Sequence, residues 1–297
     1  MIILLLGKNG QVGWELQRSL VPLGRITALD RHGAGDCCGD LADLEALGTT
    51  VRRLRPDVIV NAAAYTAVDQ AEADPDLAWR INAAAPAVLA HEAAASGALL
   101  VHYGTDYVFD GSGERPWRED DAPAPLNHYG RTKLAGEQAI VQSGCRHLIL
   151  RTSWVYAARG GNFIRTMLRL ARGREHLAVV DDQWGAPTGA ELVADVSAHA
   201  IVQVCAQPAK AGLYHLAAAG QTCWRDYARH LFEQAARLRP DQPLAAREVA
   251  GVATRDYPTP ARRPLNSRLD TRRLQAAFGL VLPPWQDGVG RVLEEIL

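Results

Sequence analysis

Short unbroken apolar runs alternate with helical patterns along the first half of the chain. Continuous apolar runs are typical of strands that are buried on both faces of a parallel sheet. We expect five strands, at residues 2–6, 26–30, 57–65, 98–111 with the loop that ends it, and 147–156. Helices are expected between them at residues 10–24, 40–56 and 74–97, with Asp40 as the N-cap of the second. This order predicts an α/β fold with a doubly wound parallel sheet of the Rossmann type.

The pattern changes after about residue 153. A helix is expected at residues 159–173, a strand and a loop at 177–189, and a long helix near 191–207. We therefore expect a dinucleotide-binding domain at residues 1–153 and a smaller, partly interleaved substrate domain at 154–297. The helix near 191–207 is expected to return to the first domain.

Composition and charge exclude several classes of protein. The 297 residues are 48% hydrophobic and 22% charged, which is ordinary for a soluble globular protein. The net charge of −1 gives no general attraction to nucleic acid or to an anionic membrane. No apolar run reaches the roughly 18 residues that a membrane helix needs. The five cysteines include no C-x-x-C pair, so neither a zinc site nor a disulfide framework is predicted, and a reducing cytoplasm is favoured.

Gly7, Gly10 and Gly13 follow the first expected strand and open the first expected helix. At that position, backbone N–H groups can approach a pyrophosphate at the helix N-terminus. A tight turn alone explains many such glycine trios. Here Asp30 ends the next strand, where an acid can hold an adenosine ribose. Arg31 follows directly and can pair with a 2′-phosphate, so the loop predicts a site for NADH or NADPH and leaves the choice between them open.

Tyr129 and Lys133 are four residues apart and share one face if the segment is helical. A free phenol has a pKa of about 10, and a neighbouring ammonium lowers it, so the pair would form a general acid. Thr105 ends the fourth strand, at the edge where such sheets bind ligands, and its hydroxyl can hold a substrate oxygen. An isolated pair of this type usually lies on a surface. Its place after a dinucleotide loop favours catalysis.

Several segments together resemble the extended short-chain dehydrogenase/reductases and, within them, the dTDP-4-dehydrorhamnose reductase family. They are GKNGQVG, NAAAYTAVDQAE, GTDYVFDG, YGRTKLAGE, RTSWVY, DQWGAPT and RRPLNSRLD. The glycine loop and the Tyr129–Lys133 pair belong to the whole superfamily, whereas TDYVFDG, RTSWVY and APTG are specific to the narrower family. Gly104 departs from the pattern, because relatives more often carry serine there. The resemblance implies NAD(P)H-dependent reduction of the 4-keto group of dTDP-4-dehydro-6-deoxy-L-mannose to dTDP-L-rhamnose.

The resemblance also implies a role for particular residues. Thr105, Tyr129 and Lys133 would form the catalytic triad. Residues that would contact the cofactor follow the first three strands: Gly10, Gln11 and Val12 at the pyrophosphate, Asp30 at the ribose, Asp40 and Leu41 near the adenine, and Ala63, Ala64 and Tyr65 after the third strand. Residues that would contact the sugar nucleotide are Thr66, Val68, Asp106 and Trp154.

A homodimer is a further implication of the resemblance. Some members of the family form dimers around a magnesium ion, which would be held here by Glu15, Glu191 and Glu295. Hard oxygen ligands suit Mg²⁺. The alternative interpretation is that these are ordinary surface carboxylates.

An arginine cluster, one histidine and two tryptophans are the remaining candidate residues. The arginine cluster at 261–273 either meets the substrate diphosphate or forms a solvated face. His102 is expected to be a hydrogen-bonded core histidine, and Trp184 and Trp224 are expected to be core residues.

Two rival functions are considered. A nucleotide-sugar dehydratase or epimerase would share the scaffold, but related dehydratases usually carry an acid at the position of Tyr107. A non-catalytic, nucleotide-binding regulatory subunit is the other rival, and the Tyr129–Lys133 pair argues against it.

Overall fold

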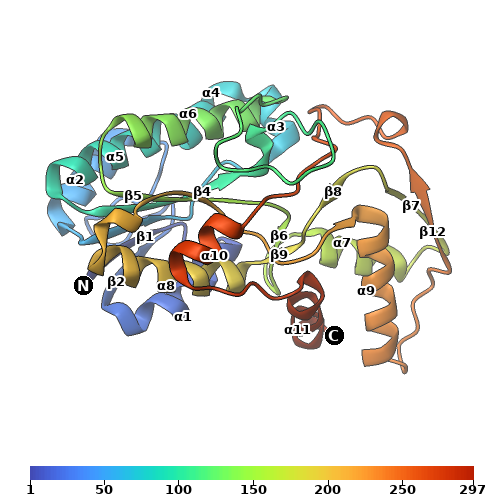
Figure 1. Cartoon of the computed structure of the whole chain (residues 1–297). Helices are drawn as coiled ribbons and strands as arrows, with labels where there is room; N and C mark the ends of the chain where they lie inside the picture. Colours follow the sequence, from blue (N-terminus) through green and yellow to red (C-terminus); the bar gives the residue numbers. More distant parts are fainter.

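Six strands form one parallel sheet in the computed structural model, which describes residues 1–297 (Figure 1). The strand order is β10-β5-β4-β3-β1-β2, and every neighbouring pair is parallel. The strands are β1 (Ile2–Leu6), β2 (Arg25–Leu29), β3 (Val58–Asn61), β4 (Leu99–Thr105), β5 (His147–Thr152) and β10 (Gly212–His215). The predicted fold class is therefore confirmed.

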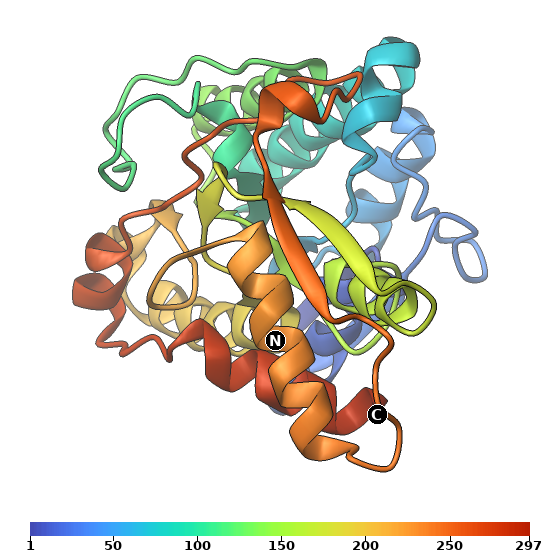
Figure 2. The ribbon, with the colours of Figure 1, turned by 90° about the vertical axis from the view of Figure 1, so that its right-hand side faces the viewer.

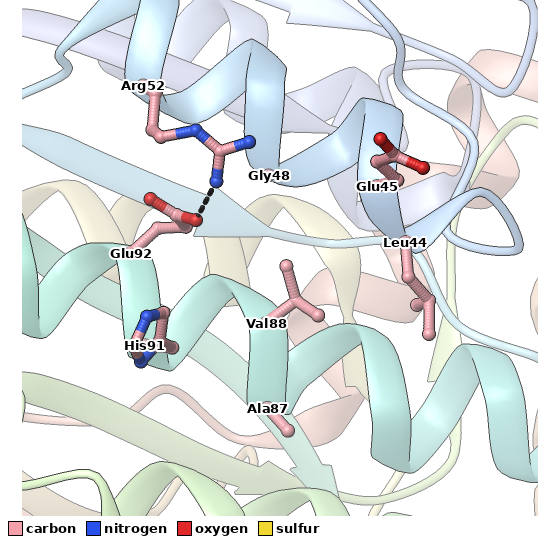
Figure 3. A pocket seen from close by; sticks show the side chains of 8 residues that line it. All are labelled: Leu44, Glu45, Gly48, Arg52, Ala87, Val88, His91 and Glu92. Atoms are coloured by element: carbon pink, nitrogen blue, oxygen red, sulfur yellow. Dashed lines mark hydrogen bonds and ion pairs between the residues drawn. The ribbon is translucent and has the colours of Figure 1, made fainter.

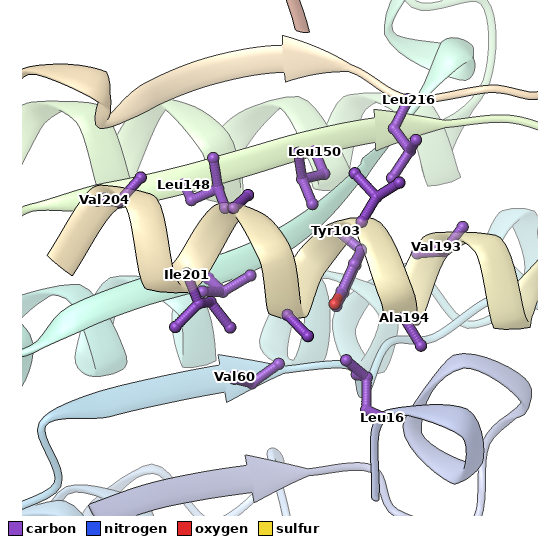
Figure 4. Packing of buried hydrophobic residues seen from close by; sticks show 14 of the residues in the cluster. Leu16, Val60, Tyr103, Leu148, Leu150, Val193, Ala194, Ile201, Val204 and Leu216 are labelled. Atoms are coloured by element: carbon purple, nitrogen blue, oxygen red, sulfur yellow. The ribbon is translucent and has the colours of Figure 1, made fainter. Parts of the chain in front are cut away.

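Helices cover both faces of this sheet (Figure 1). One face carries α2 (Leu44–Leu54), α5 (Ala85–Ser96) and α6 (His128–Gln142). The other carries α1 (Gln11–Leu20), α8 (Ala190–Ala206) and α10 (Arg272–Phe278). Figure 4 shows the core on this second face, in which Val193 and Ile201 of α8 belong to one buried cluster with Leu148 and Leu150 of β5. The apolar side chains of α8 are thus buried under the sheet, although this helix comes well after residue 153 in the sequence.

The remaining segments build a smaller lobe beside the sheet, which faces the viewer in Figure 2. Its helices are α7 (Phe163–Ala171), α9 (Trp224–Leu238) and α11 (Trp285–Ile296). Its short strands pair as β7 (His176–Val180) with β12 (Glu248–Val252), β6 (Val155–Tyr156) with β9 (Thr188–Gly189), and β8 (Trp184–Gly185) with β11 (Thr222–Cys223). A separate core around Tyr227, Leu231 and Trp285 holds this lobe together. The expected domain division at residue 153 stays a prediction. Two elements that come after that residue in the sequence, α8 and β10, pack with the first domain.

The predicted N-cap of the second helix is wrong. The helix α2 begins at Leu44, and Asp43 caps it by accepting a hydrogen bond from the Ala46 N–H at 3.0 Å. Asp40 accepts instead from the Ala42 N–H at 2.9 Å, within a turn that precedes the helix. Both aspartates can cap, and the residue after each of them, Leu41 or Leu44, packs in the same core, so the local pattern does not choose between them.

The third strand and the helix that follows it also differ from the prediction. The third strand ends at Asn61, and two short helices, α3 (Val68–Ala73) and α4 (Pro75–Trp79), follow it. The expected helix at 74–97 contains a π-helical turn, Arg80–Ala84, between α4 and α5. Asn82 in this turn bonds the backbone N–H and C=O of Tyr65 at 2.9 and 3.0 Å. The π turn therefore fixes the loop that leaves the third strand.

The first helix is shorter than expected, and the sixth strand was not predicted. The helix α1 ends at Leu20, and Pro22 lies in the 3-10 turn Val21–Leu23 that follows it. The strand β10, Gly212–His215, lies at the edge of the sheet, and its sequence GLYH contains no apolar run longer than two residues. None of the helices combines the length and the hydrophobicity needed to cross a bilayer.

Candidate active site

The carboxyl ends of β1, β3, β4 and β5 open on a cleft of about 920 Å³. This is the edge at which doubly wound sheets bind ligands. Most of the candidate site residues line the cleft: Gly7, Gly10, Gln11, Val12, Ala63, Ala64, Thr66, Val68, Thr105, Asp106, Tyr129, Lys133 and Trp154. The fold thus brings the predicted catalytic, cofactor and substrate residues into one space.

The other predicted cofactor residues lie outside the lining of this cleft. Gly13 is buried in α1, where a Cβ would come within 2.0 Å of the Gly7 carbonyl oxygen, so only glycine lets the helix approach the loop. Leu41 is buried in the core beneath α2, beside the Asp40 turn. Tyr65 is held by the π turn through its backbone. Arg31 is exposed just after β2.

Asp30 follows β2 and is bound by three groups of the chain. Its carboxylate accepts from the Asn9 amide at 2.7 Å and from the His32 N–H at 2.9 Å, and it lies 3.6 Å from the Lys8 ammonium. The hydrogen bond from His32 is the main cause that lowers the pKa of Asp30, with Lys8 acting in the same direction. The carboxylate therefore stays ionised and can accept hydrogen bonds from a ribose.

The first turn of α1 fits an anion. Gly10 is its N-cap, and no side chain caps the turn, so its free N–H groups open on the cleft. Asn162, which sequence reasoning missed, fixes the Gln11 side chain by donating to its Oε1 at 3.0 Å. Together with the helix dipole, this donor set suits the pyrophosphate of a dinucleotide.

Asn127 sets the start of α6 and thereby the position of Tyr129 and Lys133. Its Oδ1 accepts from the Gly130 N–H at 2.8 Å, and its Nδ2 donates to the Arg262 carbonyl at 2.8 Å. The helix begins at His128, so Tyr129 and Lys133 lie one turn apart on the face that lines the cleft. The predicted helical spacing of this pair is observed.

Lys133 is buried and held from behind the cleft. Its Nζ donates to the Tyr103 carbonyl at 2.6 Å and lies 3.3 Å from His102 Nε2. Burial lowers the pKa of Lys133 to about 8, against the opposing effect of Glu137. His102 is a hydrogen-bonded core residue, as expected, but one of its partners is Lys133, which also lines the cleft.

The pKa of the Tyr129 phenol is raised, whereas the sequence predicted that Lys133 would lower it. Burial raises the pKa of Tyr129 to about 12, and a hydrogen bond with Thr105 only partly offsets this. Lys133 is directed to Tyr103 and His102, so desolvation dominates at the phenol. Tyr129 also contacts Tyr107 edge to face, with ring centres 5.7 Å apart. At neutral pH the side chain is therefore a protonated acid.

Asp106 brings a buried carboxylate to the same wall. Its Oδ1 accepts from the Thr105 hydroxyl at 3.3 Å, whereas its Oδ2 is buried without a partner. Burial raises the pKa of Asp106 to about 7, although Ser267 and Thr105 lower it. An unpartnered buried oxygen in a ligand cleft is a site for a donor such as a sugar hydroxyl.

A buried ion pair supports the floor of the site. Glu137 of α6 accepts two hydrogen bonds, at 2.7 and 3.0 Å, from Arg151 of β5. A Cβ on Gly104 of β4 would lie 2.2 Å from Glu137 Oε1, so a side chain there would displace the pair. The departure at Gly104 thus has a packing role, directed to Glu137 rather than to the Thr105 hydroxyl.

Aromatic side chains form another wall of the cleft. Trp154 stacks on Trp224 with ring centres 3.6 Å apart, and Phe163 packs on Trp224 at 4.6 Å. The backbone of Trp154 has φ = 49°, a left-handed conformation that costs roughly 1–3 kcal/mol. Trp224 lines the cleft as well as packing in the lobe, so its expected role as a core residue is incomplete. Its sequence position in a helical pattern carried no sign of this.

The arginine cluster divides between the two interpretations. Arg263 lines the cleft, where Asp69 holds it by two hydrogen bonds at 2.9 and 2.7 Å. Arg262, Arg272 and Arg273 are exposed. Arg263 is therefore the one guanidinium of the cluster that lines the cleft.

Glu15, Glu191 and Glu295 come near one another at the junction of α1, α8 and α11. Burial is the main cause that raises the pKa of Glu191, and both other glutamates add to it. Arg291 lies 3.3 Å from Glu191, and Arg18 lies 3.8 Å from Glu15. No group of three or more potential metal ligands assembles within one chain.

A second hollow lies away from this chemistry. Figure 3 shows it between α2 and α5, with Leu44 and Val88 on its apolar walls and an ion pair between Arg52 and Glu92 at one end. None of the predicted site residues contributes to it.

Known proteins are similar to this chain along its whole length. The family profile described as RmlD substrate binding domain matches residues 1–297. The chain is 57% identical over 296 residues to a dTDP-4-dehydrorhamnose reductase of Shigella flexneri, which covers 100% of this chain and 98% of that protein. It is 46% identical to one of Burkholderia thailandensis, with 100% and 99% covered.

Solved structures agree with the fold. A dTDP-4-dehydrorhamnose reductase of Clostridium acetobutylicum has a TM-score of 0.89 at 33% identity, covering 100% of this chain and 99% of that one. The enzyme of Bacillus anthracis, in complex with NADP, has a TM-score of 0.86 at 33% identity, with 99% of each chain covered. A Thermus thermophilus UDP-glucose 4-epimerase with NAD shares the fold at 20% identity and a TM-score of 0.76, covering 100% and 99%.

Proposed function

The chain belongs to the RmlD substrate binding domain family, and we propose that it reduces the 4-keto group of dTDP-4-dehydro-6-deoxy-L-mannose to give dTDP-L-rhamnose. It is an oxidoreductase that uses a nicotinamide cofactor, a group present in the Bacillus anthracis complex with NADP. The observation that carries the proposal is one cleft that joins the α1 N-terminus to Thr105, Tyr129 and Lys133.

The side chains account for the proton chemistry of this reaction. The bound cofactor supplies the hydride. Tyr129 is protonated at neutral pH, so it can give its proton to the oxygen that becomes the C4 hydroxyl. The Thr105 hydroxyl would hydrogen-bond the same oxygen. Lys133 would hold the nicotinamide ribose with an N–H that Tyr103 and His102 leave free.

Recognition of the sugar nucleotide falls to the remaining lining residues. The unpartnered Oδ2 of Asp106 would accept from a sugar hydroxyl. Trp154 would contact the sugar or its nucleotide, together with Thr66 and Val68. Arg263, oriented by Asp69, suits the diphosphate.

Both NADH and NADPH are proposed as cofactors. Asp30 would accept hydrogen bonds from the adenosine ribose of NADH and would repel the 2′-phosphate of NADPH. The exposed Arg31 follows it and would pair with that phosphate. Asp40 and Leu41 would lie near the adenine.

A magnesium-linked homodimer and a reducing cytoplasmic compartment complete the proposal. Glu191 is crowded by Glu15 and Glu295, and a divalent cation would relieve this crowding. Because one chain assembles no complete ligand set, a second copy would have to contribute. All five cysteines are free thiols, which suits the cytoplasm.

The test is oxidation of reduced cofactor, followed by absorbance, with the dTDP-linked 4-ketosugar and with UDP- and GDP-linked analogues. We expect turnover with the dTDP sugar. Tyr129→Phe should lower kcat by roughly 10²–10⁴-fold with cofactor affinity little changed, because only the acid is lost. Tyr107→Phe is the matched control, since Tyr107 contacts the same ring. No turnover of any ketosugar, with cofactor still bound, would favour a regulatory subunit.

A further inference from the structure

A buried polar chain runs behind the cleft from α6 to the end of β3. Lys133 Nζ lies 3.3 Å from His102 Nε2, and His102 Nδ1 lies 3.2 Å from Asn61 Nδ2. Asn61 Oδ1 accepts a hydrogen bond from the Ala63 N–H at 3.3 Å. Lys133, His102 and Asn61 are each at most 2% exposed, so bulk water does not satisfy the nitrogens that face one another here, although Lys133 also borders the cleft. The donors and acceptors of these three side chains therefore have to be satisfied within the protein.

Hydrogen-bond counting allows one arrangement when Lys133 is charged. An ammonium only donates, so His102 Nε2 must accept. A neutral imidazole then carries its proton on Nδ1 and needs an acceptor at Asn61. The Asn61 amide would have to present Oδ1 to His102, which removes the acceptor from the Ala63 N–H.

The opposite arrangement holds when Lys133 is a neutral amine. Nζ can then accept from His102 Nε2–H, while it still donates to the Tyr103 carbonyl. His102 Nδ1 is free to accept from Asn61 Nδ2, and Asn61 Oδ1 accepts from Ala63. The observed amide orientation is the one that satisfies this second arrangement.

We propose that His102 is a positioning residue whose tautomer follows the charge on Lys133, so that loss of the lysine proton is relayed through Asn61 to the backbone of Ala63. One proton leaves Lys133 for water. The imidazole stays neutral, and its own proton is exchanged from Nδ1 to Nε2. Ala63 lines the cofactor cleft, so the relay links the charge of the lysine to the wall that the cofactor would touch. The functional meaning of this link rests on the proposed function.

The charges around the chain keep the imidazole neutral throughout. Burial, and then Lys133, hold the pKa of His102 well below its ordinary value. Burial lowers the pKa of Lys133 to about 8, which places its titration in an accessible range. Glu137 on α6 opposes this effect and is itself paired with Arg151 of β5. Tyr129, one turn before Lys133 on α6, keeps its proton over the same range.

The direct test is ¹⁵N NMR of the imidazole nitrogens in the cofactor-free full-length protein from pH 6 to 10. The signals of His102 are assigned by their loss in His102→Gln. We expect the Nδ1–H tautomer at low pH and the Nε2–H tautomer at high pH, with a midpoint near the Lys133 titration. Lys133→Met should leave one tautomer at every pH. A tautomer that does not change with pH, or a change that persists in Lys133→Met, would overturn the proposal.

Two variants separate positioning from mere packing. A glutamine amide oxygen can replace the Nε2 acceptor toward Lys133, whereas leucine replaces neither ring nitrogen. The alkaline limb of kcat/KM should stay in place in His102→Gln and move down by about 1 pH unit in His102→Leu, because a charged lysine loses an acceptor. Equal activity losses with an unmoved limb would refute the assignment. If His102→Leu does not fold, the NMR experiment on the wild type decides.

Because the NMR readout needs neither ketosugar nor cofactor, it is independent of the proposed reduction. If the reduction assay fails but the His102 tautomer changes with pH, only the proposed reduction is refuted. A working reductase with a fixed tautomer would refute only the relay.

Discussion

Asp106 shows how a single residue can serve binding at the expense of stability. Its carboxyl pKa is raised to about 7 by burial, whereas in the unfolded chain it is near its usual value of 3.8. Between these values the unfolded chain has lost the proton that the folded chain keeps. The folded state is therefore penalised increasingly as pH rises from about 4 to about 7, and fully above that.

Replacing this carboxyl should remove the penalty. Asp106→Asn should raise the free energy of unfolding at pH 8, relative to its effect at pH 4, by on the order of 4 kcal/mol, since the pKa is raised from 3.8 to about 7 and one pKa unit corresponds to about 1.4 kcal/mol. Denaturant unfolding at both pH values measures this difference. The exposed Asp120→Asn is the control. The interpretation fails if Asp106→Asn changes stability equally at both pH values.

The neighbouring pair Asp30 and Arg31 should set the choice of cofactor. We expect kcat/KM for NADPH and NADH to lie within about 30-fold, because the repulsion by Asp30 and the attraction by Arg31 offset each other. Arg31→Ala should penalise NADPH selectively and Asp30→Ala should penalise NADH selectively. Arg25→Ala, at the exposed start of β2, is the control. A wild-type preference above 10³-fold, or an equal effect of Arg31→Ala on both cofactors, would contradict this assignment.

At the scale of elements, one asparagine connects the cofactor helix with the smaller lobe. Asn162 caps α7 through its Oδ1, which accepts from the Arg165 N–H at 3.2 Å, while its Nδ2 donates to Gln11 at the start of α1. Arg159, in the same loop, stacks over Trp14 of α1 at 3.6 Å. Two contacts thus hold the loop before α7 against the first turn of α1.

The two roles of Asn162 can be separated by substitution. Asn162→Ala should lower the free energy of unfolding by about 1 kcal/mol through loss of the cap and should also weaken cofactor binding. Asn162→Asp keeps the capping oxygen, so it should weaken cofactor binding with little change in stability. Fluorescence titration with NADPH and thermal unfolding measure the two effects. Arg159→Ala is the control that leaves the Gln11 bond intact. Wild-type affinity in Asn162→Asp would exclude this contribution.

At the scale of the whole molecule, the two lobes are not separate segments of the chain. The chain builds five strands, leaves to form α7 and β7, and returns with α8 and β10 to the sheet. The cleft lies where these passages meet, since Lys133 comes from α6, Trp154 follows β5 and Trp224 begins α9. A change in the packing of the lobes would therefore alter the cofactor and substrate walls together.

Assembly is tested at the same scale. If Glu15, Glu191 and Glu295 from two copies bind Mg²⁺, then EDTA should shift the sedimentation profile toward monomer, because the crowded carboxylates would again repel one another. Glu191→Gln should have the same effect, whereas Glu233→Gln, exposed on α9, should not. An unchanged profile with EDTA, together with no metal in the purified protein, would refute the magnesium-linked dimer.

Local patterns predicted some elements better than others. The first strand, at 2–6, and the fourth, predicted within residues 98–111, follow from apolar runs that only a buried strand accommodates. The cap at Asp43 rather than Asp40 was not predictable, because both aspartates fit the local rule and each accepts a hydrogen bond from a nearby backbone N–H. The four-residue β10 carries too little local signal to be recognised before its neighbour β5 is in place.

The sequence alone determined the doubly wound class, the glycine loop and the helical spacing of Tyr129 and Lys133, because each depends on residues close together in the chain. Only the tertiary structure decided the electrostatics of the site. Burial raises the pKa of Tyr129 and lowers that of Lys133, and burial depends on residues from distant segments. The same holds for Asn162, Trp224 and Arg263, whose positions in the cleft come from folding the second half of the chain back against the first.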